Sequence, residues 1–359
     1  MHPAATPVRY NPDVEQHEEG EAETIQGLKD TFTDILETTS KDYGHAVRGV
    51  HAKGHAVVTG TIEVLGDLPS ALAQGLFARP GTYDAVLRFS TNPGDILDDS
   101  VVVPRGLALK VLDVDTPDGA QDFVMADGPA FFAGSAKFFL QNVKLLAATT
   151  DRVEWLKKAQ SLLLRGVENT LEAVGLESAT LKSLGGTPST HPLGRTYYSQ
   201  TAFRYGEYVA KFSVAPLSPN LTALADAKVA VAGRPDALRE EIAEVLAEGD
   251  GVWELRVQLC TDLDTMPVED PTKVWDEGDS PFVPVARITV PAQPTWVNGV
   301  SQQREDRLLF TPWHCLDAHR PLGAVNRVRK PVYELSSGYR SRFNGCPIHN
   351  MRTAQEVDA

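Results

Sequence analysis

The 359-residue sequence predicts an α+β fold, an antiparallel β-barrel with helices packed around it. Several segments alternate apolar and polar residues with a period of two, which is the pattern of strands with one buried face. Between them lie turns and stretches in which apolar residues recur at helical spacing. Because no internal repeat and no linker divides this order of elements, we expect a sheet closed into a barrel and covered by helices.

The chain is expected to begin with an extended arm and a helix. Residues 1–22 contain scattered prolines followed by a run of acidic residues, a composition that predicts a loosely held N-terminal arm. The remaining residues, 23–359, are expected to form a single domain. Its first element is a helix, in which apolar side chains recur at Ile25, Leu28, Phe32, Ile35 and Leu36.

Strand patterns and helical patterns then follow along the chain. Alternating or Gly- and Pro-bounded segments predict strands over residues 58–64, 83–90, 107–114, 208–214 and 253–259. Apolar stripes at helical spacing predict helices over residues 151–177, 236–247 and 324–342. A loop rich in Gly, Ser, Thr and Pro is expected over residues 183–194.

The composition is that of a globular protein and argues against two classes of partner. The formal net charge is −14, whereas a general nucleic-acid surface and a polybasic membrane anchor both need clustered Lys and Arg. The N-terminus has no secretory pattern, and no stretch reaches the ~18 apolar residues of a membrane-spanning helix. The three cysteines form no C-x-x-C pair, so reduced thiols are expected. We therefore expect a cytoplasmic protein.

Six motifs between residues 45 and 342 carry the chemical information, and they occur in one collinear order. They are Arg48-Gly49-Val50-His51-Ala52-Lys53-Gly54; Arg88-Phe89-Ser90-Thr91; Pro104-Arg105-Gly106 with Ala108 and Lys110; Pro129-Ala130-Phe131-Phe132 with Phe139; Asp270-Pro271-Thr272-Lys273-Val274-Trp275 with Pro284-Val285; and Arg329 and Tyr333 with Arg340. Each motif is weak alone. Together they resemble the haem catalases, and the chain is similar to the short, catalase-related branch, which implies a catalase-like antiparallel β-barrel.

The resemblance implies that the cofactor is haem b, with Tyr333 as the ligand of its iron. Phenolate is one of the axial ligands that haem proteins use. A free phenol ionises with a pKa of about 10, so it needs help to ionise at neutral pH. Arg329 precedes Tyr333 by one helical turn, which would place its guanidinium beside the phenolate. Pro331 lies between them, and we expect the helix to start, kink or break there.

On the opposite side of the haem, the resemblance implies His51 as the acid–base group. A neutral imidazole can take a proton from one peroxide oxygen and return it to the other. Ser90 corresponds to the hydroxyl that the family pairs with this histidine. A regular strand would turn Arg48 and His51 to opposite faces, so we expect an irregular strand start or an arginine that reaches around the edge.

Further residues are implied to hold the cofactor. The two propionates need cations, and guanidinium groups suit carboxylates. The corresponding residues here are Arg48, Arg88 and Arg340. The apolar residues implied to flank the haem are Val50, Phe132 and Phe139.

The chain departs from the family beside Phe131. Large catalases carry an Asn there that hydrogen-bonds peroxide, whereas this chain has Met125-Ala126-Asp127-Gly128-Pro129. A gapless match places Ala126 at the Asn position. A one-residue deletion places Asp127 there instead, so Asp127 is kept as a candidate catalytic residue, although a carboxylate cannot donate a hydrogen bond. The acidic residue that large catalases have before their P-R-G segment is Val103 here.

These departures favour a haem peroxidase with weak catalase activity, whose partners are peroxide and a small organic reductant. Three alternatives stay open: an efficient catalase, an allene oxide synthase-like enzyme that rearranges or oxygenates organic hydroperoxides, and a non-catalytic haem binder. Val50 counts against the second, because allene oxide synthases carry Thr at that position. A homodimer is kept open as the assembly, and the sequence does not identify the reductant.

Overall fold

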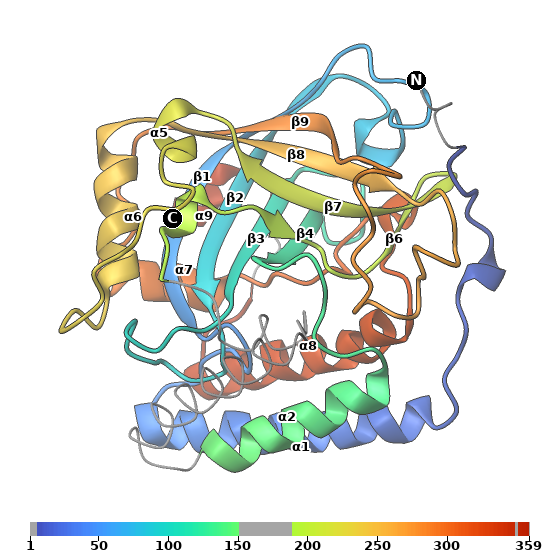
Figure 1. The fold of residues 1–359 in the computed structure, drawn as a ribbon. Helices are drawn as coiled ribbons and strands as arrows, with labels where there is room; N and C mark the ends of the chain where they lie inside the picture. The colour runs from blue at the N-terminus through green and yellow to red at the C-terminus, as the bar shows by residue number, and fades with distance from the viewer. Residues whose placement is uncertain (1–5, 151–188, 349–350, 359) are drawn as a thin grey trace, which may run out of the picture.

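The computed structural model describes residues 6–150, 189–348 and 351–358, and within them nine strands form one antiparallel sheet (Figure 1). The sheet order is β5-β4-β3-β2-β1-β9-β8-β7-β6. β5 also pairs with β7, and this pairing closes the sheet into a barrel with β6 alongside β7. The strands are β1 (Lys53–Val64), β2 (Gly81–Thr91), β3 (Arg105–Leu112), β4 (Ala120–Ala126), β5 (Tyr197–Tyr198), β6 (Phe203–Tyr205), β7 (Tyr208–Pro216), β8 (Gly251–Leu259) and β9 (Val283–Val290).

A layer of three long helices covers one side of the barrel. It consists of α1 (Glu21–Tyr43), α2 (Ala136–Thr150) and α8 (Ala324–Asn344), and α8 lies between the barrel and the other two (Figure 1). The shorter helices are α5 (Pro219–Thr222), α6 (Ala237–Glu248), α7 (Val300–Arg307) and α9 (Ala354–Asp358), with 3-10 turns η1 (Pro12–Val14), η2 (Gly75–Phe77), η3 (Pro192–Gly194) and η4 (Asp317–His319). No helix in the described ranges is both long and apolar enough to cross a bilayer.

Two apolar clusters hold these layers together. The first fills the barrel, where alternate residues of the strands point inward and rings such as Phe89, Phe123 and Trp253 are buried. The second lies between α1, α2 and α8 and includes Leu28, Phe32, Ile35, Phe139 and Val328. Burial of this apolar surface holds the three long helices against one another. A ligand site can form between the barrel and the helix layer.

The predicted fold class is confirmed, and most predicted strands and helices are present within a few residues. Strand β4 was not predicted because buried polar residues interrupt its pattern: Asp122 is fully buried and forms an ion pair with Lys110 at 2.6 Å. β5, β6, β9, α2, α5, α7 and α9 were also not predicted. The helix predicted over residues 151–177 lies outside the described residues.

Residues 6–20 precede α1 as an arm that contains the 3-10 turn η1, and this arm is not loosely held. The Val8 N–H donates to the Cys260 carbonyl at 2.8 Å, and the Tyr10 N–H donates to the Glu207 carbonyl at 2.7 Å. Arg320 donates to the Glu15 carboxylate at 3.0 Å. These contacts tie the arm to the barrel, so the expectation of loose attachment was wrong for these residues.

Helix α8 runs through Pro331 without starting or ending there. The proline removes the N–H that would bond to the Arg327 carbonyl one turn earlier. The side chain of Arg327 forms ion pairs with Glu15 and Glu21, each at 3.0 Å, and these hold the residue in place. The helix therefore neither starts nor breaks at Pro331, and of the three expected irregularities only a kink stays a prediction.

We predict that Leu28→Ala lowers the free energy of unfolding by about 2–5 kcal/mol, because it leaves a cavity in the cluster between the three long helices. Leu28 is 0% exposed, whereas Leu145 on α2 is 62% exposed. Leu145→Ala is therefore the matched control and should change stability by no more than about 0.5 kcal/mol. Urea denaturation followed by circular dichroism measures both. Equal effects of the two substitutions would show that this cluster is not a core.

Candidate active site

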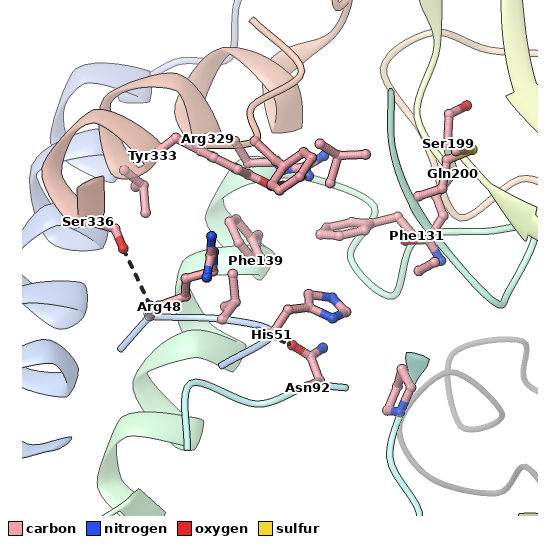
Figure 2. Close-up of a pocket in the computed structure, with 18 of the residues that line it drawn as sticks. Arg48, His51, Asn92, Phe131, Phe139, Ser199, Gln200, Arg329, Tyr333 and Ser336 are labelled. Atoms are coloured by element: carbon pink, nitrogen blue, oxygen red, sulfur yellow. Dashed lines mark hydrogen bonds between the residues drawn. The ribbon is translucent and has the colours of Figure 1, made fainter. Parts of the chain in front are cut away.

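A cavity of about 400 Å³ lies between the outer face of the barrel and the three-helix layer, and its walls are mostly apolar (Figure 2). A volume of this order is typical of small-molecule and cofactor sites. Segments far apart in the sequence meet here: the loop before β1, the end of β4, α1, α2 and α8. The predicted site residues that line it are Arg48, Val50, His51, Asp127, Phe132, Phe139, Arg329, Tyr333 and Arg340.

One wall is formed by α8, which carries Arg329 and Tyr333 one turn apart (Figure 2). The Arg329 guanidinium donates to the Tyr333 hydroxyl oxygen at 3.0 Å. Its other hydrogen bond goes to the Asn326 side-chain oxygen at 3.2 Å. Neither partner is a carboxylate, and among the described residues no carboxylate pairs with Arg329. Its charge is therefore directed at the phenol oxygen.

Asn326 fixes the orientation of this arginine. It is 0% exposed, and its amide nitrogen donates to the carbonyls of Ala202 and Leu322 at 3.2 and 2.8 Å. The Thr201 hydroxyl donates to its side-chain oxygen at 3.2 Å. Because the amide is anchored to the backbone, the side-chain oxygen has one position from which to accept the Arg329 N–H.

The opposite wall carries His51, which has a left-handed backbone with φ of 50°. Regular strand β1 starts only at Lys53, so the predicted irregular start is confirmed. The Ser90 hydroxyl lies 3.3 Å from His51 Nδ1, and Arg88 donates to the His51 carbonyl at 3.0 Å. A Cβ at Gly106 would lie 2.7 Å from the imidazole, so only glycine leaves the ring its place.

The environment of His51 keeps its ring neutral. Burial, with the positive charges of Arg88 and Arg329, lowers the pKa of His51 to about 3. A neutral imidazole has one nitrogen that can accept a proton. The ring can therefore act as a base over the whole range around neutral pH.

A cluster of three arginines, Arg48, Arg88 and Arg340, lies at one end of the cavity around the carboxylate of Glu305. Arg88 Nε donates to Glu305 Oε1 at 2.5 Å, and Arg48 approaches the same carboxylate at 3.9 Å. Burial raises the pKa of Glu305, but the coulombic attraction of the three guanidiniums and the hydrogen bond from Arg88 outweigh it, and the pKa lies below its usual range. Glu305 is therefore ionised.

This cluster has more positive charge than its carboxylate neutralises. Burial, together with the charge of Arg88, outweighs the neighbouring carboxylates and lowers the pKa of Arg340 to about 10. Burial and the same like-charge repulsion lower the pKa of Arg48. Both side chains line the cavity, and Arg340 Nε is buried without a hydrogen-bond partner among the described residues. An anion bound at this end of the cavity would relieve the repulsion.

Arg88 differs from the other two, because it does not line the cavity. Its guanidinium lies behind His51 and is engaged by Glu305 and by the carbonyls of His51 and Ala52. A direct contact of Arg88 with a bound cofactor stays a prediction. The position of Glu305 explains the difference, because its carboxylate accepts a hydrogen bond from the Arg88 guanidinium.

Three phenylalanine rings form an aromatic wall of the cavity. Phe131 and Phe132 have ring centroids 4.5 Å apart, and Phe139 lies 5.4 Å from Phe131 and 5.8 Å from Phe132. Phe131 points into the cavity between α8 and His51 (Figure 2). A flat apolar ligand could pack against these rings.

Ala126 and Asp127 differ in the direction in which their side chains point. Ala126 pairs directly with Gly106, so its methyl group shares the face on which His51 packs. The Asp127 carboxylate instead pairs with Arg195 at 2.9 Å and accepts the Arg105 backbone N–H at 3.1 Å. The geometry therefore favours the gapless match, with Ala126 beside His51.

Several polar residues at the site were not predicted, among them Asn92, Gln200 and Glu305. Asn92 and Gln200 line the cavity, and Glu305 holds the arginines. Asn92 could have been predicted, because it lies two residues after Ser90 and so continues the alternation of Arg88 and Ser90. Glu305 lies 217 residues from Arg88 on a short helix that was not predicted, and no local signal points to it.

Two comparisons with known sequences agree on one family. The model of the catalase family matches residues 41–303, which is most of the chain but ends before α8. The catalase of Methanosarcina barkeri is 30% identical over 264 residues, which cover 69% of this chain and 50% of that protein. The catalase of Schizosaccharomyces pombe is 27% identical over 334 residues, which cover 83% of this chain and 64% of that protein. The chain thus spans half to about two thirds of these relatives.

Solved structures show the same fold. A fungal catalase superposes with a TM-score of 0.60 at 19% identity, covering 90% of this chain and 64% of that one. Catalase A from Saccharomyces cerevisiae also gives 0.60, at 20% identity, covering 89% of this chain and 64% of that one. Because the family model matches residues 41–303, which is more than half of the chain, the chain belongs to the catalase family.

Proposed function

We propose that the cavity binds haem b and that the protein uses peroxide to oxidise a small organic donor, with slow release of oxygen. Three features of the cavity fit a haem. The aromatic wall suits a flat macrocycle, the guanidinium groups of Arg48 and Arg340 suit its propionates, and Tyr333 offers a phenol oxygen opposite His51. The buried Arg340 Nε, unpartnered within the described part of the chain, is the observation that most needs such an anion.

Tyr333 would be the residue that holds the iron. Ionisation of its phenol would give Arg329 the anionic partner that it lacks among the described residues, at a distance already set to 3.0 Å. A charge-assisted hydrogen bond of this kind is about twice as strong as a neutral one. Asn326 keeps the guanidinium in place, so the stabilisation needs no rearrangement.

His51 would move the proton on the other side. A bound haem would supply the iron to which peroxide coordinates and the electrons that break the O–O bond. The neutral ring accepts the proton of one peroxide oxygen and delivers it to the other oxygen, which leaves as water or, from an organic hydroperoxide, as an alcohol. Ser90 and Gly106 fix the orientation of the ring during both transfers.

The observation that carries the preference for donor oxidation is the side chain at position 126. Large catalases carry an amide donor there, whereas this chain presents a methyl group on the His51 face. A second peroxide is then held less tightly, and an organic donor competes better for the oxidised site. The names of the curated relatives favour efficient oxygen release as the second candidate. A homodimer and a cytoplasmic location stay predictions.

We predict that Tyr333→Phe abolishes or grossly alters the absorption spectrum of the haem-loaded protein, because it removes the ligand oxygen. Tyr339 lies on the same helix but does not line the cavity, and its hydroxyl bonds to Ser40 at 2.8 Å. Tyr339→Phe is the control and should leave the spectrum unchanged. An unchanged spectrum in Tyr333→Phe would exclude this residue as the ligand.

We predict that His51→Ala slows peroxide cleavage by about 10²–10⁴-fold, because it removes the proton acceptor, while haem content stays nearly normal. In the unmodified protein the pKa of His51 is about 3, so the ring stays neutral when the pH falls. Cleavage should therefore show no loss through about pH 6.5, the usual pKa of histidine. Stopped-flow absorption measures both rates. A twofold fall near pH 6.5 that His51→Ala removes would show that the ring is not shielded as described.

We predict that Ala126→Asn raises oxygen release relative to donor oxidation by about tenfold to a hundredfold, since one hydrogen bond to a reacting group can contribute ~3 kcal/mol. Asp127→Asn is the comparison variant, because Asp127 points toward Arg195 instead. An oxygen electrode and a phenolic dye measure the two outcomes in parallel. If Asp127→Asn alone raised the ratio, Asp127 and not Ala126 would occupy the amide position.

A further inference from the structure

Three alternate residues contact His51: Arg88 and Ser90 of β2, and Asn92, which follows the end of that strand. Arg88 Nη2 donates to the His51 carbonyl at 3.0 Å, and Ser90 Oγ lies 3.3 Å from its Nδ1. Asn92, the next residue in this alternation, accepts the His51 backbone N–H on its Oδ1 at 3.4 Å (Figure 2). The side chain of Asn92 is therefore fixed beside the histidine and on the cavity side.

The amide nitrogen of Asn92 has no hydrogen-bond acceptor among the described residues. Asn92 Oδ1 is turned to the His51 N–H, so Nδ2, with its two N–H groups, points away from it. Within the described part of the chain Nδ2 donates to no protein group, and Asn92 lines the cavity. Gln200 is the other amide in the described lining, but its nitrogen donates to the carbonyls of Gly128 and Ala130 at 3.0 and 2.7 Å.

We propose that Asn92 is a second polar group of the peroxide site, whose Nδ2 donates a hydrogen bond to the peroxide oxygen beside His51. This inference rests on the proposed function and deepens it. The ring of His51 accepts a proton, and peroxide also has oxygen lone pairs that need a donor. A neutral amide supplies that donor without adding charge next to Arg88 and Arg329. An amide donor is thus available at the site just after the end of β2, whereas Ala126 lies at the end of β4.

Asn92 acts at a different step from the residue at position 126. It adjoins the backbone of His51, so its donor serves the binding and cleavage of the first peroxide, which donor oxidation and oxygen release share. Its loss should slow both outcomes by a similar factor and leave their ratio unchanged. The substitution at Ala126, in contrast, should change the ratio.

The test compares variants that separate the two ends of the amide. Asn92→Ala removes acceptor and donor, whereas Asn92→Asp keeps an oxygen for the His51 N–H and removes the donor. Ala126→Asn in the Asn92→Ala background returns a donor without charge and without the acceptor. All are made in the full chain and loaded with haem, and thermal unfolding confirms that each is folded. The readouts are the rate of peroxide cleavage and the equilibrium Kd for cyanide, a small probe of the same position.

If Asn92 is a donor, Asn92→Ala and Asn92→Asp both slow cleavage by about 10–100-fold and weaken cyanide binding, and the further Ala126→Asn substitution leaves cleavage slow and changes only the ratio of oxygen release to donor oxidation. If Asn92→Asp behaves as the unmodified protein, Asn92 only positions His51 and the proposal is wrong. Unchanged values in both single variants contradict it as well. A haem-loaded protein that consumes no peroxide, but whose cyanide affinity falls in both variants, would contradict the proposed function and still support the role of Asn92.

Discussion

The site depends on one constraint, the fixing of His51 in a left-handed conformation before strand β1 begins. A non-glycine residue in this region is strained and persists only when its surroundings determine it. Here Arg88, Ser90 and Asn92 each contact a different atom group of His51, and Gly106 leaves room for the ring. Because these contacts come from two adjacent strands of a closed sheet and from the residue that follows one of them, the barrel itself positions the histidine.

On the other side of the cavity, neighbouring residues likewise hold the charged side chains in fixed positions. Asn326 holds Arg329 against Tyr333, and the buried arginine cluster retains positive charge that Glu305 does not neutralise. Buried like charges are unfavourable unless an anion joins them. The cavity therefore offers positive charge for a ligand with two carboxylates and a phenol oxygen for a cation. The neutral His51 lies on the opposite wall.

The sequence was sufficient for the elements and residues that carry a local signal. Alternating strands and the four-residue spacing of Arg329 and Tyr333 are local, and the structure brings that pair together as predicted. Strand β4 was not predicted because a buried ion pair replaces apolar residues in it. Glu305 could not be predicted, since its role depends on a fold that joins segments 217 residues apart. The direction of Ala126 and Asp127 likewise required the register of β3 and β4.

The central claim is that this cavity turns peroxide into an oxidant for an organic donor. Its most direct test is a stepwise addition of hydrogen peroxide to the haem-loaded protein with a phenolic donor present, while absorption and dissolved oxygen are recorded together. Each peroxide that is reduced to two waters takes two electrons, so the account predicts two molecules of a one-electron donor oxidised per peroxide and little oxygen. Release of one oxygen for every two peroxides, with the donor untouched, would contradict it.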